Sequence, residues 1–287
     1  MSRIIAQHNP IAFKTQAIQV KASSEVLHYT PVGLPLSFAA MQDRRQPIDL
    51  ADPEHFEVTL ANLGVSVALE LTWRGRRFQL LIKEPDSAQL KLISGYVPAH
   101  ELRVPLLTAM NEIAEELLLE TESGWLQGRY QDTWLPTPYA DTLPLDPRRH
   151  YCLAPQRGAS RAVMCRELNL LERPRAYVHL PTNSLQLIYY LSLQLPDNLE
   201  HISGLHADER LDTASGQLIT QLDYQNADLY LAEFAAQAPT GQLFQLSRGE
   251  LIEQSGHVFT LGEAMAEQEG WVVRERKTDW PDGLHNL

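Results

Sequence analysis

The chain has 287 residues, of which 44% are hydrophobic, and its 36 acidic and 24 basic residues give a formal net charge of -12. This length and balance are typical of one large or two small globular domains with a sizeable core. The acidic excess repels phosphate backbones over long range, so a general nucleic-acid binder is disfavoured. A small phosphorylated ligand is not, because a bound cation reverses the local sign of the charge.

The two cysteines, Cys152 and Cys165, are too few for a disulfide scaffold and lack the close spacing of a zinc site. We therefore expect reduced thiols and a cytoplasmic location. Residues 1–20 contain no continuous apolar run of the kind found in signal peptides. No uncharged apolar stretch of about 18 residues occurs, so no membrane contact is expected.

The first 58 residues predict a small β-rich extension. Apolar and polar residues alternate over 17–21 and, less regularly, over 25–29, which indicates strands. Residues 42–55 are polar and contain two prolines, which is typical of a linker or surface loop.

Residues 65–83 predict a β-hairpin. Alternation over 65–72 indicates the first strand, 73–77 the turn, and 78–82 the return strand. A short extended segment containing Gly95 follows at 90–97.

Residues 105–120 form the clearest predicted helix. Pro105 suits a first helical turn, and four apolar residues recur at spacings of four, three and four, namely Leu106, Met110, Ile113 and Leu117. We expect this helix to end near Gly124, since Gly is a natural C-terminal cap.

The rest of the chain predicts a main domain over 59–287 with an insertion near 135–174. The insertion is rich in proline and contains a short predicted helix at 159–171. Further strands are expected, followed by a last helix; the strands are at 185–195, 217–222, 229–234 and 243–246, and the helix at 260–269.

Three carboxylates share one face of the predicted central helix. Glu112, Glu115 and Glu116 lie at positions i, i+3 and i+4, opposite the apolar stripe. Three like charges there destabilise a helix unless something offsets them, and Mg²⁺ or Mn²⁺ would do so because these ions take carboxylate oxygens. The plain alternative is a solvated acidic face, which is common on amphipathic helices.

The residues upstream of this helix make a solvated acidic face less favoured and a metal site more favoured. Gly95 stands six residues before Glu101, between the hairpin and the acidic helix. The segment from Gly95 to Leu119 resembles the box of the Nudix hydrolase family, a glycine and a glutamate followed by a helix carrying a Glu-apolar-x-Glu-Glu pattern. Gly95 and Glu101 match its opening, and the helical part matches at Glu112, Ile113, Glu115, Glu116 and Leu119.

Four features depart from the family pattern. Asn111 stands where the family has Arg, and Leu118 where it has Gly. The spacing between Glu101 and the helical motif is two residues longer, and Ile93, Ser94 and His100 replace loop residues of the usual box. The missing Arg weakens a restraint on a loop carboxylate.

The resemblance implies an α/β fold, a Nudix-like α/β/α sandwich with a mixed curved sheet. It implies hydrolysis of a nucleoside diphosphate linked to another group, with Mg²⁺ or Mn²⁺ as cofactor. Glu112, Glu115 and Glu116 would be catalytic and would bind the metal, with Glu101 a weaker ligand. Gly95 and Arg77 are the predicted substrate contacts. Pairing into a homodimer is compatible with the same resemblance.

Two other functions stay open. The altered box could belong to a ligand-binding or protein-interaction module that has lost efficient chemistry. The chain could also be a purely structural α/β protein whose glutamates are solvated.

Other polar residues of the sequence are explained without a functional role. Asp208 and Glu209 could supply a remote base but are more typical of a solvated turn, and His201 and His206 are read as surface histidines. Residues 148–150, Arg-Arg-His, could contact phosphate but such runs are usually solvated. Neither a nucleophile elbow nor a phosphate-binding P-loop motif occurs.

Overall fold

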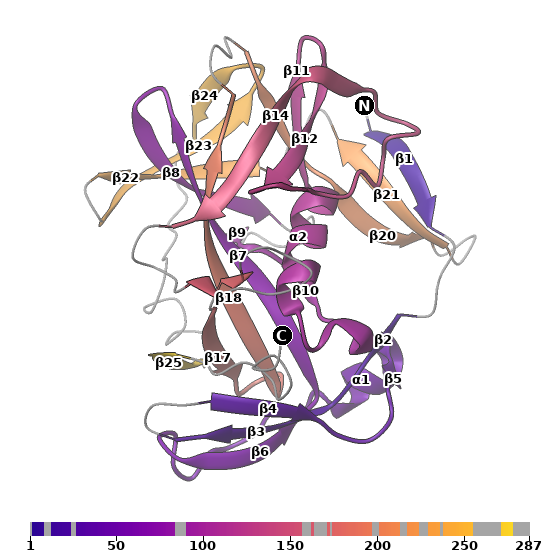
Figure 1. The fold of residues 1–287 in the computed structure, drawn as a ribbon, viewed down its shortest axis with the longest axis vertical. Helices are drawn as coiled ribbons and strands as arrows, with labels where there is room; N and C mark the ends of the chain where they lie inside the picture. The colour runs from indigo at the N-terminus through magenta and orange to yellow at the C-terminus, as the bar shows by residue number, and fades with distance from the viewer. Residues whose placement is uncertain are drawn as a thin grey trace.

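The computed structural model describes residues 2–8, 13–23, 27–83, 90–156, 162–163, 171–172, 174–196, 201–212, 217–223, 229–235, 238–254 and 271–277. This part of the chain is a mixed α/β fold made mostly of strands, with a curved half-barrel sheet (Figure 1). Its helices are α1 (Phe38–Arg44), the short 3-10 helix η1 (Ala99–Glu101) and α2 (Pro105–Glu116). None of them is long and apolar enough to cross a membrane.

The curved sheet has the strand order β19-β11-β12-β14-β18-β7-β8-β22-β23-β24, with β9, β10, β13, β17 and β25 paired to its members. Its strands are β7 (Asn62–Trp73), β8 (Arg76–Lys83), β9 (Leu90–Lys91), β10 (Ile93–Tyr96), β11 (Leu117–Thr121), β12 (Gly124–Tyr130), β13 (Thr133–Trp134), β14 (Leu145–Pro155), β17 (Arg175–His179), β18 (Ser184–Gln194), β19 (Ser203–His206), β22 (Leu229–Ala235), β23 (Ala238–Ser247), β24 (Glu250–Glu253) and β25 (Trp271–Lys277). Strand β14 is parallel to β12 and β18 is parallel to β7, whereas the other described pairs are antiparallel.

The predicted hairpin is confirmed as β7 and β8. Their two-residue turn is Arg74–Gly75, with φ of 51° and 74°. Two left-handed residues match the right-handed twist of the flanking strands, and a Gly in the second position carries no steric penalty there.

Strand β7 is the centre of the sheet. One of its edges pairs with β18 from Asn62 to Leu71. The other edge is shared, because β10 pairs with its first half and β8 with its second half. Helix α2 packs on β10 and β7, so the elements that carry the acidic motif rest on the most central strand.

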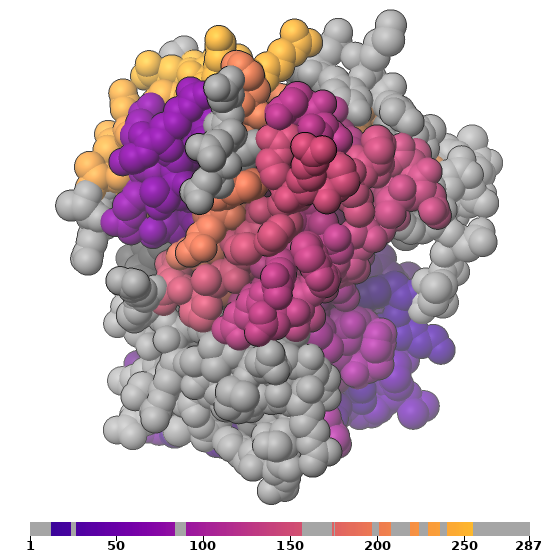
Figure 2. All heavy atoms as spheres, turned by 45° about the horizontal axis from the view of Figure 1, so that its top comes forward, coloured from indigo at the N-terminus to yellow at the C-terminus, as the bar shows by residue number. Residues whose placement is uncertain are grey.

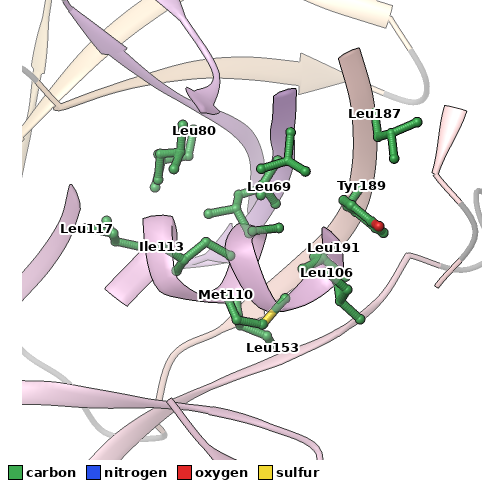
Figure 3. Packing of buried hydrophobic residues seen from close by; sticks show 14 of the residues in the cluster. Leu69, Leu80, Leu106, Met110, Ile113, Leu117, Leu153, Leu187, Tyr189 and Leu191 are labelled. Carbon is green, nitrogen blue, oxygen red and sulfur yellow. The ribbon is translucent and has the colours of Figure 1, made fainter. Parts of the chain in front are cut away.

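The apolar stripe of α2 faces this centre, as predicted. Leu106, Met110 and Ile113 point at buried side chains of β7 and β18, among them Leu69 and Leu191 (Figure 3). Each fully buried side chain of this size contributes about 1.5–3 kcal/mol of hydrophobic free energy. The stripe therefore fixes the orientation of α2 and, with it, the direction of the acidic face.

The predicted end of this helix is wrong. Helix α2 stops at Glu116, and Leu117–Thr121 is strand β11, paired with β19 on one side and β12 on the other. Leu117, Leu118 and Leu119 are all buried in this strand. A helix would turn one of these three consecutive leucines away from the core, whereas a strand covered on both faces buries all of them.

The N-terminal extension has the predicted β character. It contains a three-stranded antiparallel sheet of β4 (Leu27–Pro31), β3 (Ile18–Ala22) and β6 (Phe56–Leu60), and a small pair of β2 (Lys14–Thr15) and β5 (Leu36–Ser37). Helix α1 was not predicted; the Ser37 hydroxyl caps it by accepting from the Ala40 amide. Separately, β1 (Ser2–His8) joins β20 (Asp208–Asp212) and β21 (Gln217–Asp223) in another sheet.

The segment read as an insertion contributes to the curved sheet. Strand β14 pairs with β12 and β18, and in Figure 2 the strands β11, β12 and β14 (magenta to pink) occupy the centre of one face. The helix predicted at 159–171 is wrong where the structure describes it, because β15 (Ala162–Val163) pairs with β16 (Leu171–Glu172).

The helix predicted at 260–269 lies outside the described residues. The division into an extension and a main domain stays a prediction.

The later strands are confirmed. Predicted strands at 185–195, 217–222, 229–234 and 243–246 correspond to β18, β21, β22 and β23.

A buried ionic network fixes β14 to the β11–β12 turn. The Asp146 carboxylate accepts from the backbone amides of Arg148 and Arg149 at 2.9 and 3.0 Å and from Arg149 Nε at 2.8 Å. The Thr121 hydroxyl donates to it at 2.9 Å, and Arg149 also pairs with Glu122 at 2.8 Å. Burial raises the pKa of Asp146, but these hydrogen bonds outweigh it and hold the pKa below its ordinary value.

We expect Asp146→Ala to lower the free energy of unfolding by about 3 kcal/mol, because it leaves Arg149 without its buried partner. Urea denaturation near neutral pH measures this loss. The control is Asp132→Ala, which removes an ion pair with Arg129 whose aspartate side chain is 80% exposed, and which should change stability by less than about 1 kcal/mol.

The same network predicts a pH dependence. The folded-state pKa of Asp146 is lowered, so the stability it contributes is present above its unfolded pKa near 4 and is lost as pH falls through the lower folded value. The stability difference between the wild type and Asp146→Asn should therefore shrink between about pH 5 and pH 2. An unchanged difference across this range would contradict the role given to the carboxylate.

Candidate active site

Gly95, one of the two predicted substrate contacts, lies directly against the acidic helix α2. Gly95 is in β10, opposite Val65 of β7. A Cβ built on it would lie 1.8 Å from Glu112 Oε1, so the carboxylate of Glu112 rests on the bare backbone of this residue. Gly95 does not have positive φ, and its lack of a side chain is required for the close approach alone. The sequence motif therefore brings Gly95 and Glu112 together in space.

Glu116, at the last position of α2, faces β19. Its Oε1 lies 3.8 Å from Nε2 of His206, and its Oε2 is buried with no hydrogen-bond partner. His206 is opposite Leu117 in the β19–β11 pair, which places its ring beside the end of the helix.

Glu115 belongs to the same helical turn. Its backbone carbonyl accepts from the Tyr139 hydroxyl at 3.0 Å, and the carbonyl of Glu116 accepts from the Ala207 amide at 3.0 Å. These two donors satisfy carbonyls that a helix end leaves open, so the turn carrying both carboxylates is fixed from two sides.

The whole of α2 is enclosed. Every residue from Pro105 to Glu116 is buried or half-buried, including Glu112, Glu115 and Glu116. The acidic face therefore does not have the exposure that a solvated face would show.

Glu101 has a different environment. It ends η1, and its Oε2 accepts from the Thr108 hydroxyl at 2.6 Å in the first turns of α2. Its other oxygen lies 3.7 Å from the exposed His100. The bond to Thr108 fixes the loop on the helix, and Glu101 acts here as a positioning residue.

Arg77 lies at the other end of β7. It pairs with Glu70 through two contacts, of 3.1 and 2.7 Å. Arg77 is opposite Thr72 and Gly95 is opposite Val65, a separation of seven residues on β7, or roughly 23 Å. The structure therefore does not bring Arg77 to the acidic face, and its predicted contact with the substrate of that face is not supported.

The two altered box positions lie in different environments. Asn111 is half-buried on α2. Leu118 is buried in strand β11, in an apolar cluster with Trp125 and Tyr139. Leu118 therefore has a packing role in a sheet where the family pattern has a helical Gly.

A group of three or more His, Cys, Asp or Glu side chains placed to hold one metal ion does not occur in the described part of the chain. The predicted ligands instead divide into Glu112 against β10, Glu116 against β19, and Glu101 bound to Thr108. Glu112 and Glu116 share a helix face one turn apart.

His206 is the site residue that the sequence reading missed, since it was assigned to the surface. It is 8% exposed, and both neighbours in the strand, Leu205 and Ala207, are buried. A short run of small and apolar residues around a histidine is a signal for burial that could have revealed it.

The other polar candidates have structural explanations or lie partly outside the described residues. Arg149 is engaged by Asp146 and Glu122 rather than open to a phosphate. Asp208 and Glu209 are in strand β20 and not in a turn, and their side chains are outside the described part.

Comparison of this chain with protein-family models, with curated proteins and with solved structures finds no match.

The Gly95–Glu112 contact predicts a specific coupling. Gly95→Ala should displace the Glu112 carboxylate and lower stability by about 1–3 kcal/mol, because the added methyl group has no space. In the Glu112→Ala background the same change should cost much less. A double-mutant cycle by urea denaturation measures this difference, and additive effects would contradict the contact.

Proposed function

We propose that this chain is a Nudix-type hydrolase that cleaves a nucleoside diphosphate linked to another group with the help of Mg²⁺ or Mn²⁺. The site would be the face of α2 that carries Glu112, Glu115 and Glu116. The observation that carries the proposal is the contact of Glu112 with Gly95, which joins the two ends of the motif in a strand, loop and helix. On this proposal β10, η1 and α2 are the Nudix-like core of a larger sheet.

The electrostatics of α2 support a cation at this face. The carbonyl end of a helix has the negative end of the macrodipole, which favours basic residues there. The last turn of α2 carries Glu115 and Glu116 and no basic residue. Negative charge therefore accumulates in a half-buried place, and a divalent cation would offset it.

The donors fit a hard divalent ion in kind. Glu116 Oε2 is a buried carboxylate oxygen without a hydrogen-bond partner, and Glu112 lies on the same helix face. Mg²⁺ is commonly bound by one or two carboxylates together with waters and substrate phosphates, so the site does not need a complete cage of protein ligands. Glu112 and Glu116 would hold the ion, with Glu115 beside them.

A cation bound there would neutralise the diphosphate and lower the pKa of a bound water. The residues of the chain would do the rest. Glu112 would serve as a ligand or as general base, with its carboxylate held over the bare backbone of Gly95. Thr108 and Glu101 would hold the loop between strand and helix in place. The net charge of -12 makes the chain repel a free diphosphate, which explains why a cation would be required.

A second function is favoured by other observations. The Asn at position 111 lacks the donors of the family's Arg, Glu101 is engaged by Thr108, and three ligands do not converge within the described residues. These features suit a module that binds a nucleotide-like ligand without turning it over. Both functions use a small substrate or ligand, and assembly into a homodimer remains a prediction.

The hydrolysis of a panel of nucleoside diphosphate derivatives, with added Mg²⁺ or Mn²⁺, tests the proposal. We expect release of a nucleoside monophosphate by the wild type and a loss of at least about a hundredfold in kcat/KM for Glu116→Gln. The matched control is Glu120→Gln, because Glu120 is also half-buried but lies beyond the helix on β11.

The outcomes separate the functions. Thermal stabilisation by a panel member without product release would support the binding module and overturn the hydrolase. If neither turnover nor stabilisation occurs, and Glu116→Gln is neutral or stabilising, the acidic face has a structural role only.

A further inference from the structure

His206 is a buried histidine whose ring nitrogens have no hydrogen-bond partner among the residues that the structure describes. Its side chain is 5% exposed, and neither Nδ1 nor Nε2 has a hydrogen-bond partner. Its Nε2 points to Glu116, 3.8 Å from Oε1, and the second oxygen of Glu116 is also buried without a hydrogen-bond partner.

Such a pair is unusual in a folded protein. Most buried polar atoms have a partner, because a donor or acceptor removed from water without one destabilises the fold. Here three buried atoms of two adjacent side chains lack one. The separation of 3.8 Å is too long for a direct hydrogen bond between them.

We infer that His206 is a nitrogen ligand of the cation that Glu116 binds, so that the site prefers Mn²⁺ and later first-row transition-metal ions to Mg²⁺. This inference rests on the proposed function in that both use the Glu116 carboxylate. It names the class of metal, which the acidic motif by itself leaves open.

The geometry is close to that of a shared ion. Metal–nitrogen and metal–oxygen bonds of about 2.0–2.2 Å at a tetrahedral angle place the two ligand atoms about 3.4 Å apart. Nε2 and Oε1 would need to approach by only a few tenths of an ångström from 3.8 Å. One ion would then satisfy a ring nitrogen and the carboxylate together.

The chemistry of the donors sets the preference. Imidazole is a good ligand for first-row transition metals, whereas Mg²⁺ takes oxygen ligands and keeps its waters. For a mixed nitrogen and oxygen site the affinity rises from Mn²⁺ to Co²⁺. The expected order of affinity is therefore Co²⁺ above Mn²⁺ above Mg²⁺.

Isothermal titration calorimetry of the full chain with Co²⁺, Mn²⁺ and Mg²⁺, without substrate, tests this order. We expect His206→Gln to weaken Co²⁺ binding by on the order of ten- to a hundredfold and to leave Mg²⁺ binding nearly unchanged. His201→Gln is the matched control, because His201 is exposed and precedes the same strand. The His201→Gln variant measures how much of the Co²⁺ binding comes from an exposed histidine.

A readout on the wild type keeps the test independent of how the variant folds. Proton NMR of the Co²⁺ complex should show a hyperfine-shifted imidazole N–H signal that Glu116→Gln also removes. Co²⁺ affinity that is equal in His206→Gln and His201→Gln, or a complex without that signal, would overturn the inference and leave a bridging water as the explanation of the pair.

The failure of this inference is distinguishable from the failure of the proposed function. Turnover by the wild type, together with Co²⁺ affinity that is equal in His206→Gln and His201→Gln, would retain the hydrolase and overturn the histidine ligand. Co²⁺ binding through His206 without hydrolysis of any panel member would retain the histidine ligand and overturn the hydrolase.

Discussion

The enclosure of helix α2 is the constraint on which the rest of the structure depends. A helix with one apolar stripe ordinarily buries that stripe and leaves its polar face in water. Here the stripe packs on β7 and β18, yet every residue of the helix is at least half-buried. The acidic face is therefore held at reduced solvent exposure, where like charges repel more strongly than in water and an uncompensated carboxylate is unfavourable.

The carboxylates of Asp146 and Glu116 differ in how fully their hydrogen-bonding capacity is satisfied. Asp146 accepts hydrogen bonds from two amides, a hydroxyl and a guanidinium, and its charge is balanced by Arg149. Glu116 has one oxygen without a hydrogen-bond partner and a histidine just beyond hydrogen-bond range. Folds tolerate the second kind of placement chiefly where it serves a function, because the local stability that it loses must come from elsewhere.

The sequence predicted those parts of the fold that depend on local pattern. Alternation over 65–83 and the apolar spacing from Leu106 to Ile113 have one physical interpretation each, and both elements formed as expected. The order of strand, loop and helix around Gly95 and Glu112 also formed as expected, whereas the direct contact between these two residues was found only in the structure.

Several differences between prediction and structure depend on the tertiary arrangement and not on the local sequence pattern. The helix ends at Glu116 because the next five residues form strand β11, which pairs with β19 and β12. The local sequence around Leu117 contains no signal that predicts this pairing. Arg77 is near Gly95 in sequence but at the opposite end of β7, since the hairpin carries it away. His206 reaches the helix only through the pairing of β19 with β11, some ninety residues after Glu116.

The early end of α2 is what brings the histidine to the acidic face. Strand β11 begins immediately after Glu116, so the neighbouring strand β19 runs past the last helical turn with His206 opposite Leu117. A helix continued to Gly124 would have placed another turn of helix where this pairing now starts. Leu118 fits this arrangement, because in strand β11 its side chain is buried with Trp125 and Tyr139. The burial of Leu118 and the position of His206 thus have one physical origin, the start of strand β11 immediately after Glu116.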